Sequence, residues 1–261
     1  EGLEGRRVVV NGGEISLTAS DDAVNAAKAK TEEEEGDVPG GRGDGSMEND
    51  TEAYIKITGG TLEVDAEGDG LDSNGSIFLS GGTVYVNGPV SDGDGALDYN
   101  GGADITGGTI IAVGSSGMAQ GFSDSSAQCS ILHNLTKTQE AQTAVTLQDE
   151  DGKELLSFTP KKKYSSVLVS CPEMQEGETY TLSAGSESSA LTLESVVTSN
   201  GSAGGMGRMG GGMKGDMQKG RKPGDGSQEM PEGMEPPDGE VPEGMEPPDG
   251  EMPEGEAPQA L

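Results

Sequence analysis

Tryptophan is absent from the chain, and its 261 residues include only three phenylalanines, five tyrosines and one histidine. Pockets for small molecules and platforms for neutral sugars usually rely on aromatic faces, so few residues are available to build either. With His133 as the single histidine, a histidine-based catalytic group or a zinc site lacks ligands. We therefore expect His133 to be a structural residue.

Basic residues are also scarce. The 16 lysines and arginines face 47 aspartates and glutamates, which gives a formal net charge of −31. So acidic a chain repels phosphate backbones and anionic headgroups, and we expect no nucleic acid as a partner. It has no transmembrane run, and we expect no membrane insertion. It begins at Glu1 inside a repeated pattern and without a signal peptide, so we expect that an N-terminal part has been removed from a secreted or cell-surface protein.

Cysteine is the third scarce residue type, with Cys129 and Cys171 as the two examples. A disulfide between them would close a span of 42 residues and would suit an exported protein, but spacing alone does not bring two cysteines together. Two buried free thiols are the alternative. The sequence leaves both alternatives open.

Glycine and acidic residues, in contrast, are abundant and recur in a pattern. Four segments contain an apolar strand, a Gly-Gly pair and a second apolar strand, and acidic turns follow the first three. Repeats 1 to 4 are Val8–Asn25, Ile55–Asp72, Ile77–Asp98 and Ala103–Gly117. The pairs starting at Gly59, Gly81 and Gly107 are 22 and 26 positions apart, which is typical of stacked supersecondary units. The interval of 47 positions from Gly12 to Gly59 is interpreted as one repeat with an insertion over residues 27–52.

The repeats align in four apolar columns that alternate with polar neighbours at the period of two expected of strands. The columns are Val8/Ile55/Ile77/Ala103, Val10/Ile57/Leu79/Ile105, Ile15/Leu62/Val84/Ile110 and Leu17/Val64/Val86/Ala112. Gly-Gly is expected at a corner, where positive φ or a close backbone approach excludes a Cβ. A leucine-rich repeat would need a Leu/Asn ladder and a helical segment, and both are missing. We therefore predict an all-β fold, a parallel β solenoid over residues 1–126.

Acidic turns form two further columns. One contains Glu1, Asp22, Asp69 and Asp94, and the other contains Glu4, Asn25, Asp72 and Asp98. If the repeats stack at strand spacing, like charges ~5 Å apart cost about 1 kcal/mol per pair in water and about 3–4 kcal/mol at an effective dielectric near 20. Calcium would relieve this repulsion, because it takes 6–8 oxygen ligands in loosely defined geometry. The alternative is that Asp and Gly serve only as turn residues.

Beyond residue 126 the pattern changes to short strands separated by turns, which we interpret as an antiparallel β cap over residues 127–199 that covers the open end of the solenoid. The strands expected are Ala144–Gln148, Leu155–Phe158, Ser166–Ser170, Thr179–Ser183 and Ala190–Val197. The one basic cluster, 161–163, is interpreted as a solvated hairpin, with contact to a polyanion as the alternative. Residues 200–261 are Gly/Met-rich and then Pro/Glu-rich, and we expect them to be disordered.

Several phrases resemble a carbohydrate-binding family of secreted bacterial proteins, over about residues 1–185. They include Gly68-Asp69-Gly70-Leu71-Asp72-Ser73-Asn74-Gly75, Ser91-Asp92-Gly93-Asp94-Gly95-Ala96-Leu97-Asp98-Tyr99-Asn100-Gly101, Asp21-Asp22-Ala23-Val24-Asn25 and Gly177-Glu178-Thr179-Tyr180-Thr181-Leu182. The resemblance implies a right-handed parallel β-helix like that of pectin-degrading lyases, with bound Ca²⁺ and affinity for acidic plant polysaccharides such as polygalacturonate. The acidic turn residues of that family correspond here to Asp21, Asp22, Asp69, Asp72, Asp92, Asp94 and Asp98.

The expected function is thus noncatalytic, calcium-dependent binding of polysaccharide. Carbohydrate contacts are expected from Phe78, Tyr85 and Tyr99, with cross-strand packing as the alternative role. A polysaccharide lyase on the same scaffold is a second hypothesis. It needs a basic residue beside the metal, and Arg6, Arg7, Lys28 and Lys30 are the candidates. A surface adhesin or structural solenoid with stabilising calcium is a third.

Overall fold

The computed structural model describes residues 1–29 and 49–201, and these residues form strands and turns without any helix. The prediction of an all-β fold is therefore confirmed for the described part of the chain. Within the same residues no helix is long and apolar enough to cross a membrane. The predicted tail beyond residue 201 and most of the predicted insertion over 27–52 lie outside the described residues.

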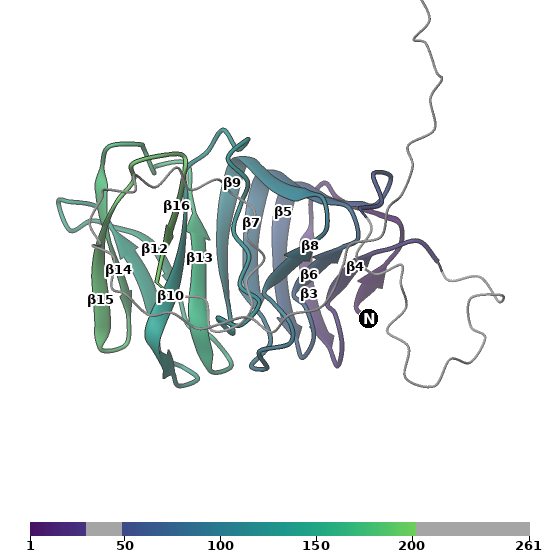
Figure 1. Cartoon of the computed structure of the whole chain (residues 1–261), viewed down its shortest axis with the longest axis horizontal. Helices are drawn as coiled ribbons and strands as arrows, with labels where there is room; N and C mark the ends of the chain where they lie inside the picture. Colours follow the sequence, from purple (N-terminus) through teal and green to yellow (C-terminus); the bar gives the residue numbers. More distant parts are fainter. Residues whose placement is uncertain (30–48, 202–261) are drawn as a thin grey trace, which may run out of the picture. The chain divides into compact units, whose positions relative to one another are not determined.

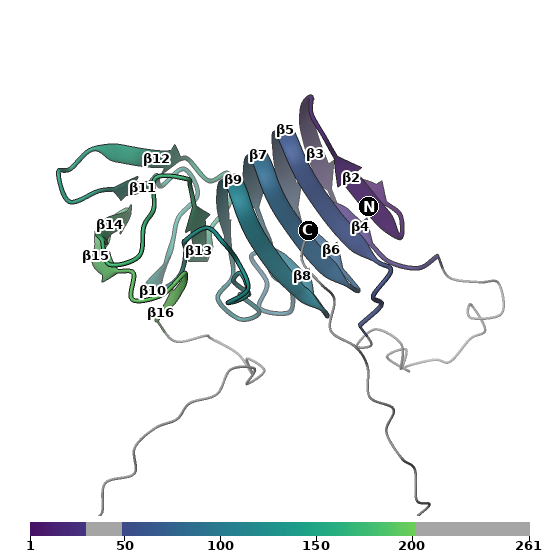
Figure 2. The same cartoon turned by 90° about the horizontal axis from the view of Figure 1, so that it is seen from above.

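Nine strands belong to the four repeats. They are β1 (Leu3–Glu4), β2 (Arg7–Val10), β3 (Glu14–Ala19), β4 (Val24–Ala26), β5 (Tyr54–Ala66), β6 (Leu71–Ser73), β7 (Ser76–Asn87), β8 (Leu97–Tyr99) and β9 (Gly102–Gly114). The long strands β5, β7 and β9 lie side by side, as Figure 2 shows, and β2 and β3 both pair with β5. The short strands form a second sheet in the order β1-β4-β6-β8. All pairs within these nine strands are parallel.

The strand register confirms the four apolar columns. One column, for example, pairs Val8 with Ile55, Ile55 with Ile77, and Ile77 with Ala103. Because repeat 1 pairs directly with repeat 2, the interval of 47 positions between them is one repeat plus an insertion, as the sequence predicted. The columns are buried along most of their length, and they form the first core of the protein. Full burial stabilises each such aliphatic side chain by ~1.5–3 kcal/mol.

The Gly-Gly pair of repeat 1 separates β2 from β3, as predicted, but in repeats 2 to 4 the pairs lie inside the continuous strands β5, β7 and β9, where the register shifts and no corner forms. The second glycine of each pair has a positive φ of 84–92°, at Gly13, Gly60, Gly82 and Gly108. A Cβ on Gly60 would lie 2.6 Å from the carbonyl carbon of Gly12 and 2.6 Å from the carbonyl oxygen of Gly13. The backbone conformation and the close approach of the neighbouring repeat therefore both require glycine.

The C-terminal part adds β10 (Ser130–Gln139), β11 (Val145–Gln148), β12 (Glu154–Phe158), β13 (Tyr164–Ser170), β14 (Thr179–Ala184), β15 (Glu187–Thr192) and β16 (Val197–Asn200). Four of these strands form an antiparallel sheet in the order β12-β11-β14-β15. Strand β13 pairs antiparallel with β9 and so occupies the edge of the repeat sheet, and β10 and β16 follow it (Figure 1). Buried side chains, mostly from these C-terminal strands, form a second hydrophobic core.

Two predictions about the C-terminal strands need correction. Strand β10 was not predicted, because its first six residues are buried and show no alternation. The predicted strand Ala190–Val197 is instead the end of β15 and the start of β16, separated by a turn. The change of direction allows Leu191 and Leu193 to enter the second core while β16 pairs with β10.

Two of the three clustered lysines pair with carboxylates of repeat 2, whereas Lys163 is exposed and pairs with Glu140. Lys161 Nζ lies 2.6 Å from Glu63 Oε1, and Lys162 Nζ lies 3.1 Å from Asp65 Oδ1. The Lys162 ammonium also donates to the carbonyl oxygen of Ala66. Lys162 and Asp65 are largely buried, with side-chain exposures of 16% and 22%, so this pair is shielded from solvent. Lys161 and Lys162 therefore join the C-terminal part to repeat 2 through ion pairs.

Candidate metal centre

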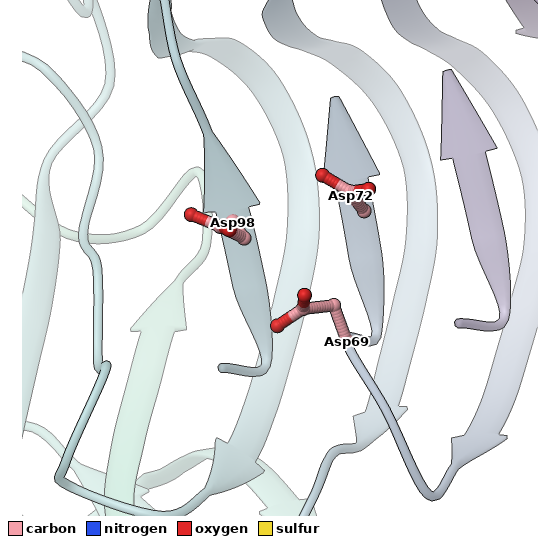
Figure 3. A group of neighbouring side chains, drawn as sticks. All are labelled: Asp69, Asp72 and Asp98. Atoms are coloured by element: carbon pink, nitrogen blue, oxygen red, sulfur yellow. The ribbon is translucent and has the colours of Figure 1, made fainter. Parts of the chain in front are cut away.

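Three aspartates of the acidic turns come together on the sheet of short strands. Asp72 lies in β6 and Asp98 lies in β8, and the two residues are partners in the parallel register of these strands. Asp69 lies in the turn that leads into β6, and Figure 3 shows its carboxylate between the other two. One carboxylate oxygen from each residue lies within 4.8 Å of the other two. We call Asp69, Asp72 and Asp98 the acidic triad.

The local sequence explains why these side chains face outward. Strands β6 and β8 have three residues each, and Leu71, Ser73 and Leu97 are buried. Successive side chains of a strand point to opposite faces, so Asp72 and Asp98 lie on the face away from the first core. Their separation is set by the spacing of neighbouring strands, ~4.8 Å.

Hydrogen bonds link the turns of successive repeats through carboxylates. Asp22 Oδ1 accepts the backbone N–H of Asp69 at 2.8 Å, and Asp69 Oδ1 accepts the backbone N–H of Gly95 at 2.5 Å. Asp98 Oδ1 accepts a bond of 2.9 Å from the side-chain amide of Gln120. The orientation of the Asp69 and Asp98 carboxylates is therefore fixed by donors from the next segments of the chain.

The acidic columns differ from their prediction at one position. The column of Asn25, Asp72 and Asp98 is confirmed by the register of β4, β6 and β8. The other column contains Glu1, Asp22 and Asp69 and continues at Gly95, since Gly2, Ala23 and Gly70 donate in turn to the carbonyls of Asp22, Asp69 and Gly95. The prediction of Asp94 at this position was wrong, because Asp22 and Asp69 are three residues before Asn25 and Asp72, and the residue three before Asp98 is Gly95.

Burial raises the pKa of Asp69 and Asp72 far above the usual range of an aspartate. Burial, together with the nearby charges of Asp98, Asp22 and Asp72, raises the pKa of Asp69 to about 8, although the hydrogen bond from Gly95 lowers it. Burial followed by the charges of Asp22 and Asp98 raises the pKa of Asp72 to about 7. Burial also raises the pKa of Asp22 to about 6. The site thus favours either protons or a bound cation.

Basic side chains do not neutralise Asp69 or Asp72. Within residues 1–29 and 49–201, none of the ion pairs with Lys, Arg or His involves these two carboxylates. The nearest charges that act on Asp72 are those of other acidic residues. Because the triad is half-buried and acidic, a divalent cation is the kind of partner that would stabilise its ionised form.

The donor set of the triad suits calcium. Three carboxylates offer hard oxygen ligands, which calcium takes at flexible geometry and in numbers of 6–8. Two of the oxygens already accept hydrogen bonds from Gly95 and Gln120. The remaining coordination positions would have to come from water or from an oxygen-rich ligand, so the arrangement would leave part of the ion accessible.

The four other predicted metal ligands lie outside the triad. Asp21 and Asp92 are exposed. Asp92 accepts a hydrogen bond from the Ser115 hydroxyl, and Asp94 Oδ2 accepts one from the Ser91 hydroxyl at 2.7 Å. Asp22 is joined to the triad through its bond to the Asp69 amide.

Gln120 is a site residue that the residue pattern gave no reason to select. Its amide donates to Asp98, and its Oε1 accepts the backbone N–H of Tyr99 at 3.2 Å. It follows the last repeat in a segment without strand periodicity, so only its contacts reveal the role.

An aromatic groove lies on the sheet of long strands. It has a volume of about 440 Å³ and is lined by Tyr54, Lys56, Phe78, Leu79, Ser80, Asp104 and Thr106. Phe78 is 38% exposed and forms an edge-to-face pair with Tyr54, with ring centroids 6.4 Å apart. In the strand register Phe78 has Lys56 on one side and Asp104 on the other. The groove thus combines an aromatic face with a cation, an anion and two hydroxyls.

The other two predicted carbohydrate contacts are packed against the protein. Tyr85 stacks on Phe158, with ring centroids 5.3 Å apart and planes 14° apart, at the border of the second core. Tyr99 packs against the first core, and its hydroxyl donates to the carbonyl of Gly121. Of the three predicted aromatic contacts, Phe78 is therefore the one with an exposed ring in the groove.

Comparisons of the chain with models of protein families, with curated proteins and with solved structures found no match. The interpretation of the triad and the groove therefore rests on their own geometry and chemistry.

Proposed function

We propose that the protein is a secreted or cell-surface module that binds acidic polysaccharide without catalysis and depends on Ca²⁺ to do so. The observation that carries the proposal is the acidic triad, three half-buried carboxylates held within 4.8 Å of one another. Calcium bound there would keep open coordination positions. A uronic acid carboxylate, such as that of polygalacturonate, would fill them and be bridged to the protein by the ion.

The aromatic groove is the proposed contact for a sugar ring. Phe78 would stack against the apolar face of the ring. Lys56 would pair with a sugar carboxylate, and Asp104 would accept hydrogen bonds from sugar hydroxyls. This assignment keeps Phe78 from the predicted contacts, adds Tyr54 as its support, and leaves Tyr85 and Tyr99 as packing residues.

The scaffold proposed for both sites is a right-handed parallel β-helix. Support comes from the parallel register of successive repeats in both sheets and from the glycine pair with positive φ that recurs in every repeat. Connections between parallel strands of one sheet are right-handed in almost all proteins. The parallel stacking of repeats in register would place the acidic turns on the same side of the coil.

Binding is favoured over lyase chemistry because of the basic residues. A lyase needs a base beside the metal to remove a proton from the sugar. Arg6 pairs with Asp50 and Glu52, and Arg7 lies 3.6 Å from Glu52, so these candidates are engaged elsewhere. Lys30 lies outside the described residues.

The test is polygalacturonate binding by affinity electrophoresis and calorimetry, with calcium and with chelator. We expect binding in calcium, loss of at least tenfold in affinity with chelator, and a similar loss in the Asp72→Asn variant. Asp124→Asn is the matched control, because Asp124 is exposed and outside the triad. Phe78→Ala should weaken binding severalfold, whereas Tyr85→Leu should not.

Three outcomes would contradict the proposal. Binding that is equal with and without calcium would remove the role of the ion. Calcium-dependent stabilisation without any polysaccharide binding would favour a structural solenoid. A rise in ultraviolet absorbance from unsaturated product in the presence of calcium would favour a lyase.

A further inference from the structure

Cys129 and Cys171 lie at matching ends of an antiparallel strand pair. Both are free thiols. Cys129 immediately precedes β10, and Cys171 immediately follows β13. In the register of these strands Ile131 is opposite Val169. Cys129 is two residues before Ile131, and Cys171 is two residues after Val169. The same register therefore places the two cysteines opposite each other.

Side-chain hydrogen bonds keep the two segments together beyond the last paired residues. The Ser170 hydroxyl donates to the carbonyl oxygen of Cys129 at 2.6 Å. The side-chain amide of Gln128 donates to the same hydroxyl at 2.8 Å. The chain before β10 is therefore still adjacent to the chain at the end of β13, which supports the extension of the register to the cysteines.

Both cysteine side chains lie on the same face of the sheet. Ile131 and Val169 belong to the second core, whereas Leu132 belongs to the first core, so the faces alternate along the strand as expected. Cys129 is two residues from Ile131, and Cys171 is two residues from Val169. Both cysteines accordingly lie in the second core.

We propose that Cys129 and Cys171 form a cross-strand disulfide when the protein folds in an oxidising environment. Directly opposed residues of an antiparallel pair have Cα atoms ~4.5 or ~5.5 Å apart, depending on their hydrogen bonding. Disulfides span Cα separations of ~4.4–6.8 Å, so either kind of pair can be bridged with little movement of the backbone. This inference depends on neither calcium nor polysaccharide.

The oxidant would be a small-molecule disulfide such as oxidised glutathione. The thiolate of Cys129 attacks it, forming a mixed disulfide and releasing one glutathione thiol. The thiolate of Cys171 then attacks the Cys129 sulfur and releases the second glutathione thiol. Two cysteine protons and two electrons leave the protein, and the oxidant is reduced to two thiols.

The bridge should form during folding rather than afterwards. Cys129 is 6% exposed and Cys171 is 1% exposed in the folded protein. Burial raises the pKa of both thiols, that of Cys171 to about 12, so few thiolates form at neutral pH. Folded, reduced protein should therefore oxidise much more slowly than refolding protein.

The experiment is to refold the full chain from denaturant with a mixture of reduced and oxidised glutathione, and then measure intact mass and free thiols. We expect a monomer 2 Da lighter than the reduced chain, with no titratable thiol and no glutathione adduct. Peptide mapping should recover a linked pair that contains Cys129 and Cys171. Two free thiols, stable glutathione adducts or disulfide-linked dimers after refolding would each overturn the proposal.

Thermal melts give a second readout that does not depend on a variant folding well. The bridged protein should melt on the order of 5–10 °C above the same protein held reduced, because the bridge closes a long loop in the unfolded chain. The double variant Cys129→Ser with Cys171→Ser should show no difference between oxidising and reducing buffer. An equal difference in this variant would assign the effect to the buffer and overturn the proposal.

Discussion

Replacing Asp72 by asparagine should stabilise the protein at alkaline pH in the absence of calcium. The chain already places an amide, Asn25, at the neighbouring position of the same column, so the side chain is tolerated there. In the folded protein the pKa of Asp72 is about 7, against an ordinary value of 3.8. Each unit of pKa corresponds to about 1.4 kcal/mol, so ionising this carboxyl costs the fold on the order of 4 kcal/mol.

The sign of the effect follows from proton binding. Between pH 4 and pH 7 the unfolded chain has lost the Asp72 proton while the folded protein still holds it. The free energy of unfolding of the wild type therefore falls as pH rises through this window, and the stabilisation is lost above about pH 7. The Asp72→Asn variant has no carboxyl at this position, so its free energy of unfolding does not fall for this reason as pH rises. Its melting temperature should match the wild type near pH 4 and exceed it by on the order of 5–10 °C at pH 8.5.

Calcium should narrow this difference in stability. At 100 times its dissociation constant a bound ion stabilises a protein by about 2.7 kcal/mol. The ion competes with protons for the carboxylates, so its effect on the wild type should grow from pH 5 to pH 8.5. The Asp72→Asn variant should respond weakly. Circular dichroism melts with chelator and with millimolar calcium measure both effects.

Asp124→Asn is the control for the loss of one exposed negative charge, and it should follow the wild type at every pH. Equal calcium responses in the wild type and the Asp72→Asn variant would refute the assignment of the ion to the triad. Ionisation of Asp72 should lower the free energy of unfolding. An Asp72→Asn variant less stable than the wild type at pH 8.5 with chelator would contradict this expectation.

Three further changes test the packing. Gly82→Ala should lower the melting temperature by several degrees, because its φ is +84° and the new Cβ would lie 2.7 Å from a backbone oxygen, whereas Gly12→Ala meets no atom within 4 Å and should cost much less. Lys162→Met should destabilise the protein by about 1–3 kcal/mol in urea unfolding, since it leaves the largely buried carboxylate of Asp65 unpaired. Tyr85→Leu should cost about 1 kcal/mol by the same measurement through lost stacking on Phe158.

The repeat pattern made most of the strand architecture predictable. A period of two within each strand and a fixed distance between glycine pairs together determine which residues pair, and the register of Ile55 with Ile77 follows directly. The positive φ at the glycine pairs was predictable because very few residue types adopt it, but the continuation of each strand through the pair in repeats 2 to 4 was not. Such features depend on local sequence and on repetition, which a single chain displays.

Features that depend on tertiary contacts were less predictable. Strand β10 has Ser130, His133 and Asn134 among its buried residues, so it lacks the apolar alternation of a half-buried strand. The turn of repeat 3 is four residues longer than that of repeat 2, and strand periodicity does not show which of its residues aligns with Asp69, so Asp94 was predicted where Gly95 lies.

Part of the candidate site was visible in the sequence. Asp69, Asp72 and Asp98 belonged to the predicted ligands, because acidic turns aligned across repeats. Which of seven aspartates would converge depended on side-chain directions and on the Gln120 amide, a partner outside the repeats. Among the aromatics, Tyr85 resembled Phe78 in position, and only the approach of Phe158 from β12 distinguishes a packed ring from an exposed one.

The position of the triad across two repeats has a mechanical consequence. Asp69 and Asp72 belong to repeat 2, whereas Asp98 belongs to repeat 3, and Asp69 also accepts the amide of Gly95 from repeat 3. An ion held by all three carboxylates would cross-link adjacent repeats of the protein. Pulling the chain along the stacking direction would load that cross-link, so the tension at which the repeats separate would rise and fall with the calcium concentration.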